Sequence, residues 1–175
     1  QDGGNPAKAM PFRDVVFTHA APFTDKPHEL IKLATRYQSV LWARGDLALI
    51  SEYWWKTRAV KMWRIAPDAA ATPADLIANF SSEDRYNDPG MPKTRIDESG
   101  HTRLLIAADG ESIFLDGAGA SPEGDRPFVD RLNLVSKAKT RLFSSEAPVF
   151  ENVMELLDNE GKRILTTRES PTEPA

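Results

Sequence analysis

The sequence predicts an all-β protein that forms part of a β-propeller. Short apolar segments recur along the chain, most of them about five to seven residues long, which is the usual length of a strand. Clusters of Gly, Pro, Asn and Asp separate these segments and favour tight turns. A strand–turn–strand pattern also recurs around Gly45, Gly100 and Gly161. Such spacing is typical of sandwiches, barrels and propellers rather than of alternating strands and helices.

The predicted strands are the apolar segments between these turns. In chain order they occupy residues 15–17, 29–33, 39–42, 47–53, 60–65, 76–80, 103–107, 112–115, 128–134, 140–143, 153–157 and 163–167.

Three segments also fit a helical pattern. Residues 72–81 begin with Thr and Pro, which are common at a helix start, and residues 29–35 and 150–157 are similarly ambiguous. Each is about two turns long, and helices this short are marginally stable without tertiary support. We therefore predict strands for all three.

The recurring units suggest four-stranded blades of about 50 residues each. The prediction is about two complete blades, at residues 36–91 and 92–147, flanked by two half-blades at 1–35 and 148–175. The second blade is expected to begin with the strand pair around Gly100. Because a propeller needs about four or more blades to close, the chain is expected to be a piece of a larger protein. A β-sandwich with evenly spaced hairpins is the alternative.

Composition excludes several classes of protein. The net charge of −4 argues against nucleic-acid binding, which favours basic surfaces. No apolar stretch approaches the length of a membrane span. The absence of cysteine excludes disulfides, zinc–thiolate sites and thiol nucleophiles. These features leave the location open, although a periplasmic or secreted bacterial protein is favoured.

Two motifs around Ser121 resemble functional sites, but each lacks residues that the function requires. Residues 119–124 suggest a serine-nucleophile turn, but Glu123 replaces the final glycine and Pro122 lacks the N–H needed for an oxyanion hole. Residues 116–125 suggest a calcium loop, but alanines occupy two ligand positions. We expect an exposed turn here.

No other pattern assigns a catalytic, cofactor-binding or metal-binding residue. His19, His28 and His101 are scattered and lack the spacing of a metal site. Aromatic and basic residues alternate at 53–58 and 62–64, which would suit stacking on a sugar or base. Packing between strands explains the same pattern and is preferred.

Several longer strings resemble the prolyl oligopeptidase family of serine peptidases, in particular its glutamyl endopeptidase-like branch. The most characteristic is residues 119–131, GASPEGDRPFVDR. The matching strings run in family order over nearly the whole chain, and the others are residues 2–6 with 13–14, 51–53 with 56–58, 81–90 and 168–174.

The resemblance implies an N-terminal propeller above a C-terminal α/β-hydrolase domain that carries a Ser-Asp-His triad. This chain would be an internal part of the propeller, and no catalytic residue can be transferred to it. Cleavage after glutamate would require a cationic pocket. Its residues stay open, and Arg58, Arg64 and Arg126 are the cations near the matching strings.

The sequence therefore predicts a non-catalytic propeller portion of a serine peptidase, which controls the access of peptide substrates to the missing hydrolase domain. No cofactor, nucleic acid or membrane span is expected. The alternative is a free-standing β-propeller or sandwich that binds a peptide or glycan through the aromatic face near Trp54.

Overall fold

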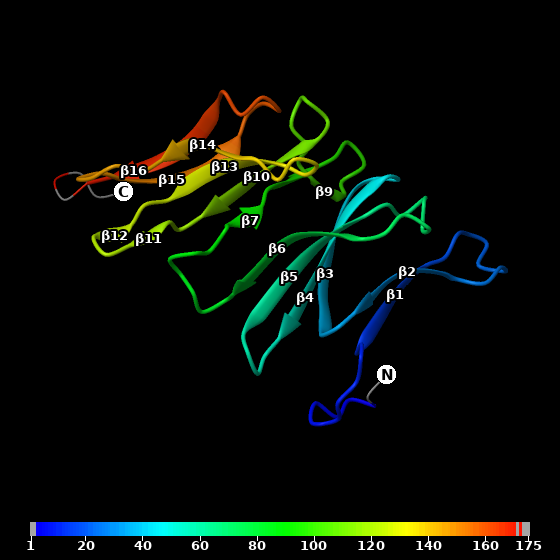
Figure 1. The fold of residues 1–175 in the computed structure, drawn as a ribbon. Coiled ribbons are helices and arrows are strands. Elements are labelled where there is room, and N and C mark those ends of the chain that lie inside the picture. Colours follow the sequence, from blue (N-terminus) through cyan, green and yellow to red (C-terminus); the bar gives the residue numbers. More distant parts are fainter. Residues whose placement is uncertain (1–2, 171, 173–175) are drawn as a thin grey trace. The chain divides into compact units, whose positions relative to one another are not determined.

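The structure is a computed structural model that describes residues 3–170 and residue 172. All regular secondary structure in these residues is β, and they contain no helix. The all-β prediction is therefore confirmed, including the choice of strands for the three ambiguous segments. None of the described segments forms an apolar helix of membrane-spanning length. Figure 1 shows the strands in chain order.

The chain divides into two compact units, Gln1–Ser82 and Glu83–Ala175. The first unit contains a two-stranded sheet, β1–β2, and a four-stranded sheet in the order β3-β4-β5-β6. All pairings are antiparallel, and the strand order shows that each strand of the larger sheet pairs with its neighbour in sequence. The strands of this unit are β1 (Asp14–Thr18), β2 (His28–Leu33), β3 (Arg36–Arg44), β4 (Leu47–Trp54), β5 (Ala59–Ile65) and β6 (Asp75–Ser81).

The core of the first unit joins its two sheets. Strand β2 contributes Ile31 and Leu33, and the larger sheet contributes Ala48, Ile50 and Ile65. The two core residues of β4 are spaced two apart, as are those of β2, because alternate residues of a strand face the same side. Burial of these aliphatic side chains holds the hairpin against the sheet.

The second unit contains a four-stranded antiparallel sheet in the order β14-β13-β10-β7 and three two-stranded sheets. The small sheets are β8–β9, β11–β12 and β15–β16. The strands are β7 (Met91–Pro92), β8 (Thr94–Ile96), β9 (Thr102–Leu104), β10 (Ser112–Gly117), β11 (Ala120–Ser121), β12 (Gly124–Asp125), β13 (Phe128–Asn133), β14 (Lys139–Ser144), β15 (Phe150–Leu156) and β16 (Ile164–Glu169).

The expected role of the strand pair around Gly100 is wrong. Within the described residues, β8 and β9 pair with each other alone, and β7 and β10 occupy the places in the large sheet that were expected for this pair. The chain leaves this sheet after Lys93, whose N–H donates to the Phe114 carbonyl at 2.8 Å. It returns at Leu105, whose N–H donates to the Lys93 carbonyl at 2.9 Å. The Gly100 hairpin is thus inserted between two neighbouring strands.

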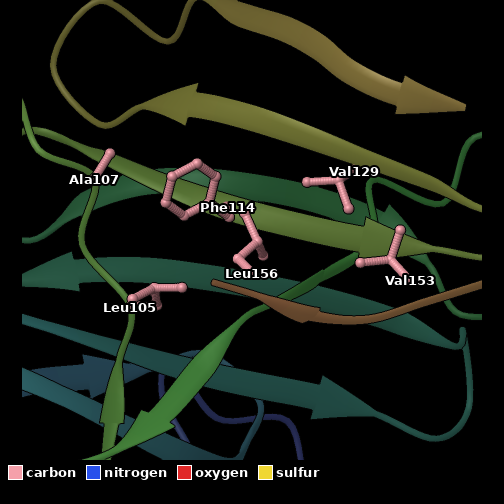
Figure 2. Close-up of a cluster of buried hydrophobic side chains, with 6 residues drawn as sticks. All are labelled: Leu105, Ala107, Phe114, Val129, Val153 and Leu156. Carbon is pink, nitrogen blue, oxygen red and sulfur yellow. The ribbon is translucent and has the colours of Figure 1, made fainter. Parts of the chain in front are cut away.

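The core of the second unit lies between the large sheet and β15–β16. Figure 2 shows its buried side chains, with Phe114 and Val129 from the large sheet and Val153 and Leu156 from β15. Phe114 is completely buried. Gly161 lies in the turn between β15 and β16, and a Cβ there would be 2.8 Å from the Phe114 ring. Because Gly161 has no side chain, the turn between β15 and β16 can pack against the core.

Candidate functional site

A pocket forms where two of the family-like strings meet in the second unit. Met91 at the start of β7 pairs with Asp116 near the end of β10. Because the two strands are antiparallel, the segment before β7 and the segment after β10 leave the sheet at the same end. Residues 83–90 and 118–127 thereby come together, although they are far apart in the sequence.

This cationic pocket has a volume of about 340 Å³. Its walls come from the segment before β7, the β11–β12 hairpin, and strands β13 and β14. Its charged lining residues are Arg85, Asp88, Arg126, Lys139 and Arg141, and its uncharged ones are Tyr86, Asn87, Gly119, Ala120, Ser121 and Phe128.

Gly119 and Arg126 close the base of the β11–β12 hairpin. The Arg126 N–H donates to the Gly119 carbonyl at 2.9 Å. Gly119 has a φ of +62°, and a Cβ there would be 1.9 Å from the Arg126 carbonyl oxygen. Glycine is needed for both reasons, because other residues rarely adopt this φ and none would fit the space. The contact fixes the backbone from which the Arg126 side chain leaves.

Arg85 is anchored across the pocket by Asp125. One guanidinium nitrogen of Arg85 lies 3.1 and 3.0 Å from the two carboxylate oxygens of Asp125. This ion pair joins the segment before β7 to the β11–β12 hairpin. Since Arg85 is 68% exposed at its side chain, its contribution to stability is small and its main effect is on the position of the two segments.

Asp130 is a buried carboxylate beneath the other side of the pocket. It lies on β13 with 1% of its side chain exposed, and it accepts hydrogen bonds from Arg141 on β14. The Lys139 ammonium lies 3.3 Å away from it. The Arg141 guanidinium also stacks 4.2 Å from the centre of the Phe128 ring. These contacts hold the half-exposed side chains of Lys139 and Arg141 at the pocket wall.

Ser121 takes part in the hairpin turn, as the sequence predicts. Its hydroxyl donates to the Gly124 carbonyl at 2.7 Å and accepts from the Glu123 N–H at 3.2 Å. Both contacts are local, so the serine serves the turn. Within the described part of the chain, no group of three or more acidic or histidine side chains is arranged to hold a metal ion.

The three histidines lie in separate places. His19 contacts the Phe23 ring at 5.4 Å, and its Nε2 is buried without a hydrogen-bond partner. His28 is exposed at the start of β2, and His101 lies 3.7 Å from Asp97 in the β8–β9 hairpin. The structure does not bring them together.

The aromatic surface near Trp54 is partly occupied by the protein itself. The buried Arg13 guanidinium stacks 4.2 Å from the centre of the Trp54 ring. Trp55 is 52% exposed, with its ring 6.2 Å from that of Trp54. The Trp63 indole donates to the buried Glu52 carboxylate at 3.0 Å. Much of the aromatic and basic pattern therefore serves packing inside the first unit.

The three cations near the family-like strings have different surroundings. Arg58 lies at a φ of +58° in the β4–β5 turn and donates to the Tyr53 hydroxyl at 3.2 Å. Arg64 pairs in register with Asp75 between β5 and β6. Arg126 alone of the three lines the cationic pocket.

The first unit has an apolar groove of about 550 Å³ between its two sheets. Val16, Leu30 and Val40 line it together with the exposed rings of Phe17 and Tyr37. Its walls come from β1, β2, β3, β4 and β5 and the residue before β1, and its polar lining groups are Arg13, Asp14 and Tyr37.

Four turn aspartates have perturbed acidity. Hydrogen bonding to Arg44 holds the pKa of Asp46 below its usual value, and hydrogen bonding to Arg103 does the same for Asp97. Hydrogen bonds from Ser112 lower the pKa of Asp109, and the Lys162 N–H lowers that of Asp158. Each of these carboxylates accepts bonds within its own turn, so their role is local and structural.

From the sequence, Arg126 was named as one of three cations near the family-like strings, without being assigned to a site, and no other basic residue of the pocket was named. Arg85 and Asp125 both lie within the family-like strings, which was the available signal. Lys139 and Arg141 lie outside those strings, and only the pairing of β13 with β14 brings them to Asp130.

The sequence is similar to two curated plant proteins. It is 34% identical to the probable glutamyl endopeptidase, chloroplastic, of Oryza sativa subsp. japonica, and 33% identical to the protein of the same name in Arabidopsis thaliana. Each match covers 99% of this chain and 20% of the relative. The chain thus spans about a fifth of the length of the curated relatives it matches.

Family models and solved structures do not identify a family or a fold for the chain. No protein-family model matches the sequence. Among solved structures, TolB from Acinetobacter baumannii superimposes with a TM-score of 0.44 at 13% identity, over 94% of this chain and 37% of that one. Similarity at this level does not establish a shared fold.

Proposed function

We propose that this chain is a non-catalytic portion of a β-propeller in a serine peptidase of the prolyl oligopeptidase family, and that it controls the access of peptides to a hydrolase domain. The observation that carries the proposal is the similarity to two proteins named as glutamyl endopeptidases, which extends over 99% of the chain. The hydrolase domain would belong to the same polypeptide.

The arrangement of the strands supports the propeller part of the proposal. Each unit contains a four-stranded antiparallel sheet, which is the composition of a propeller blade. The pairs β1–β2 and β15–β16 would be halves of two further blades. In this interpretation the blades comprise residues 36–91 and 92–147, with the half-blades at 1–35 and 148–175, except that Met91 belongs to the second blade because it pairs with Asp116. A ring of such blades admits flexible peptides and excludes folded proteins.

A preference for cleavage after glutamate is a second part of the proposal. The names of the relatives support it, and a cationic pocket is present in the second unit. In this proposal the chain does not supply the nucleophile, because Ser121 is engaged in its turn and no triad is assigned to its residues.

The test uses the complete reading frame from which the chain derives. The proposal expects a G-x-S-x-G nucleophile turn after the propeller, followed by Asp and then His. The purified product should hydrolyse a fluorogenic peptide that contains Glu faster than its Gln counterpart. Substitution of the nucleophile serine by alanine should abolish this activity and is the matched control.

A reading frame without such a domain would contradict the proposal. A full-length product that cleaves neither peptide would contradict it as well. Equal rates on the two peptides would contradict the glutamate preference alone.

A further inference from the structure

We propose that the cationic pocket binds the side-chain carboxylate of an acidic peptide, with Arg126 as its main ligand-binding group. The inference rests on the proposed function for the identity of the ligand as a peptide that contains glutamate. The pocket itself is defined by residues of the second unit.

The balance of charge in the pocket favours an anion. Arg85 is paired with Asp125, while Arg141 and Lys139 share the single carboxylate of Asp130. Arg126 has no carboxylate partner among the described residues, and its guanidinium makes one long contact of 3.4 Å with the Asp125 carbonyl. Asp88 also lines the pocket, but it accepts a hydrogen bond from the Gly90 N–H in its own turn. The basic groups therefore exceed the acidic ones.

The backbone at Arg126 and the wall formed by Arg141 are held in place before any ligand arrives. The Gly119 contact fixes the backbone at Arg126, and the buried Asp130 fixes Arg141 against the Phe128 ring. A site whose groups are already ordered loses less entropy on binding. A guanidinium is well suited to a carboxylate, since it can donate two parallel hydrogen bonds.

The dimensions of the pocket suit a short peptide segment. A volume of about 340 Å³ is at the lower end of the range for ligand sites, which run from about 300 to 1,000 Å³. A glutamate residue would fill less than half of this space, which leaves room for the residues on either side of it. The exposed ring of Tyr86 at the rim offers apolar contact to the neighbouring residues of a peptide.

The test is a binding titration on the 175-residue chain carrying Leu165→Lys, which limits association through the edge of β16, followed by heteronuclear NMR at pH 7 and low salt. The ligand is the capped peptide Ala-Ala-Glu-Ala-Ala, compared with the same peptide carrying Gln. We expect shifts at the pocket residues and an affinity for the Glu peptide at least about tenfold higher, which is the usual effect of a charged hydrogen-bonding group. Added salt should weaken binding.

Two variants test the assignment of residues. Arg126→Gln should lower the affinity for the Glu peptide about tenfold and leave the Gln peptide unaffected. Arg163→Gln is the matched control, because it removes the same charge from the same unit at an exposed position outside the pocket. If Arg126→Gln loses the native spectrum, Lys139→Gln replaces it, with an expected loss of about threefold.

Equal affinity for the two peptides would overturn the proposal, and so would unchanged binding by Arg126→Gln. Inorganic phosphate is titrated as a second probe, and binding as tight as that of the Glu peptide would overturn the peptide as ligand. Hydrolysis is not measured in these titrations. A failure of the pocket therefore leaves the peptidase proposal intact, and an inactive full-length protein leaves the binding result intact.

Discussion

The carboxylate of Glu52 accepts a hydrogen bond from the Trp63 indole at 3.0 Å while being completely buried in the first unit. The same side chain accepts the N–H and the hydroxyl of Thr35 at 2.6 and 2.7 Å. Thr35 lies between β2 and β3, so Glu52 connects the hairpin to the four-stranded sheet. The hydrogen bonds to this buried carboxylate therefore hold the β1–β2 hairpin against the four-stranded sheet.

Glu52→Ala should destabilise the protein strongly. It leaves three buried or half-buried donors without an acceptor, and the expected loss of unfolding free energy is about 3 kcal/mol. Urea unfolding followed by tryptophan fluorescence measures the effect. Glu29→Ala, at a half-exposed side chain on β2, is the control and should change stability by less than about 0.5 kcal/mol. If Glu52→Ala were as stable as Glu29→Ala, the proposed role of Glu52 would be contradicted.

Two glycines with similar backbone angles provide a second prediction. Gly161 has a φ of +72° and Gly100 a φ of +80°. A Cβ at Gly161 would lie 2.8 Å from the Phe114 ring and 2.7 Å from Leu142, whereas a Cβ at Gly100 would meet open space. Gly100→Ala should cost about 1 kcal/mol from backbone strain alone. Gly161→Ala should cost about 2 kcal/mol more, because it also disturbs the core.

Thermal or urea unfolding of the two alanine variants tests this difference. Their backbone penalties are nearly equal, so the difference between them measures the contact with Phe114. Equal destabilisation would show that the turn at Gly161 does not approach the core as described.

The lowered pKa values of the turn aspartates predict a loss of stability in acid. For a carboxylate whose pKa is lower in the folded state, the stabilisation is complete above the unfolded pKa and disappears as pH falls through the folded pKa. For Asp97 and Asp109 this places the loss below about pH 4. The urea midpoint should therefore be nearly constant from about pH 7 to pH 5 and fall below about pH 4.

Asp109→Asn tests the contribution of one carboxylate. The amide oxygen can still accept from the Ser112 N–H, but it carries no charge to titrate. The variant should lose less stability than the parent between about pH 5 and pH 3. An identical pH profile would exclude Asp109 as a source of the acid sensitivity.

The sequence was sufficient for most strands and for the hairpins around Gly45 and Gly161, and insufficient for the place of the Gly100 hairpin in the sheets. The apolar segments at β4, β5 and β13 are long enough to be recognised from local pattern. The two-residue strand β7 carries no such pattern, and its place depends on pairing with Asp116, which is distant in the chain. The Gly100 hairpin has the same local signals as the Gly45 turn, so local reasoning assigned it to the large sheet.

The members of the candidate site also come together through contacts that the local sequence does not predict. The sequence could not separate Arg126 from Arg58 and Arg64, because its place in the pocket depends on contacts over long sequence separations. Arg85 and Asp125 are 40 residues apart, and the ordering of Arg141 requires the buried position of Asp130. Burial and register determine which cations are neutralised, and neither can be calculated from composition.

The two-stranded sheets predict that the isolated chain associates with itself. Among the described residues, β1 pairs only with β2 and β16 only with β15, so each strand has a free edge. Free edges promote pairing between chains, and the half-exposed Leu165 on β16 adds an apolar contact there. Sedimentation velocity should show a mass that increases with concentration. Leu165→Lys should reduce this association, because charged residues on edge strands oppose pairing.

Val135→Lys is the matched control for the edge variant. Val135 is 60% exposed in the turn between β13 and β14, so this lysine adds the same charge at an apolar position outside the strands. If association arose from general hydrophobicity, both lysine variants would reduce it equally, whereas edge pairing through β16 predicts an effect of Leu165→Lys alone. A parent chain that stays monomeric at all concentrations would contradict the open edges, and would thereby weaken the interpretation of β1–β2 and β15–β16 as incomplete blades.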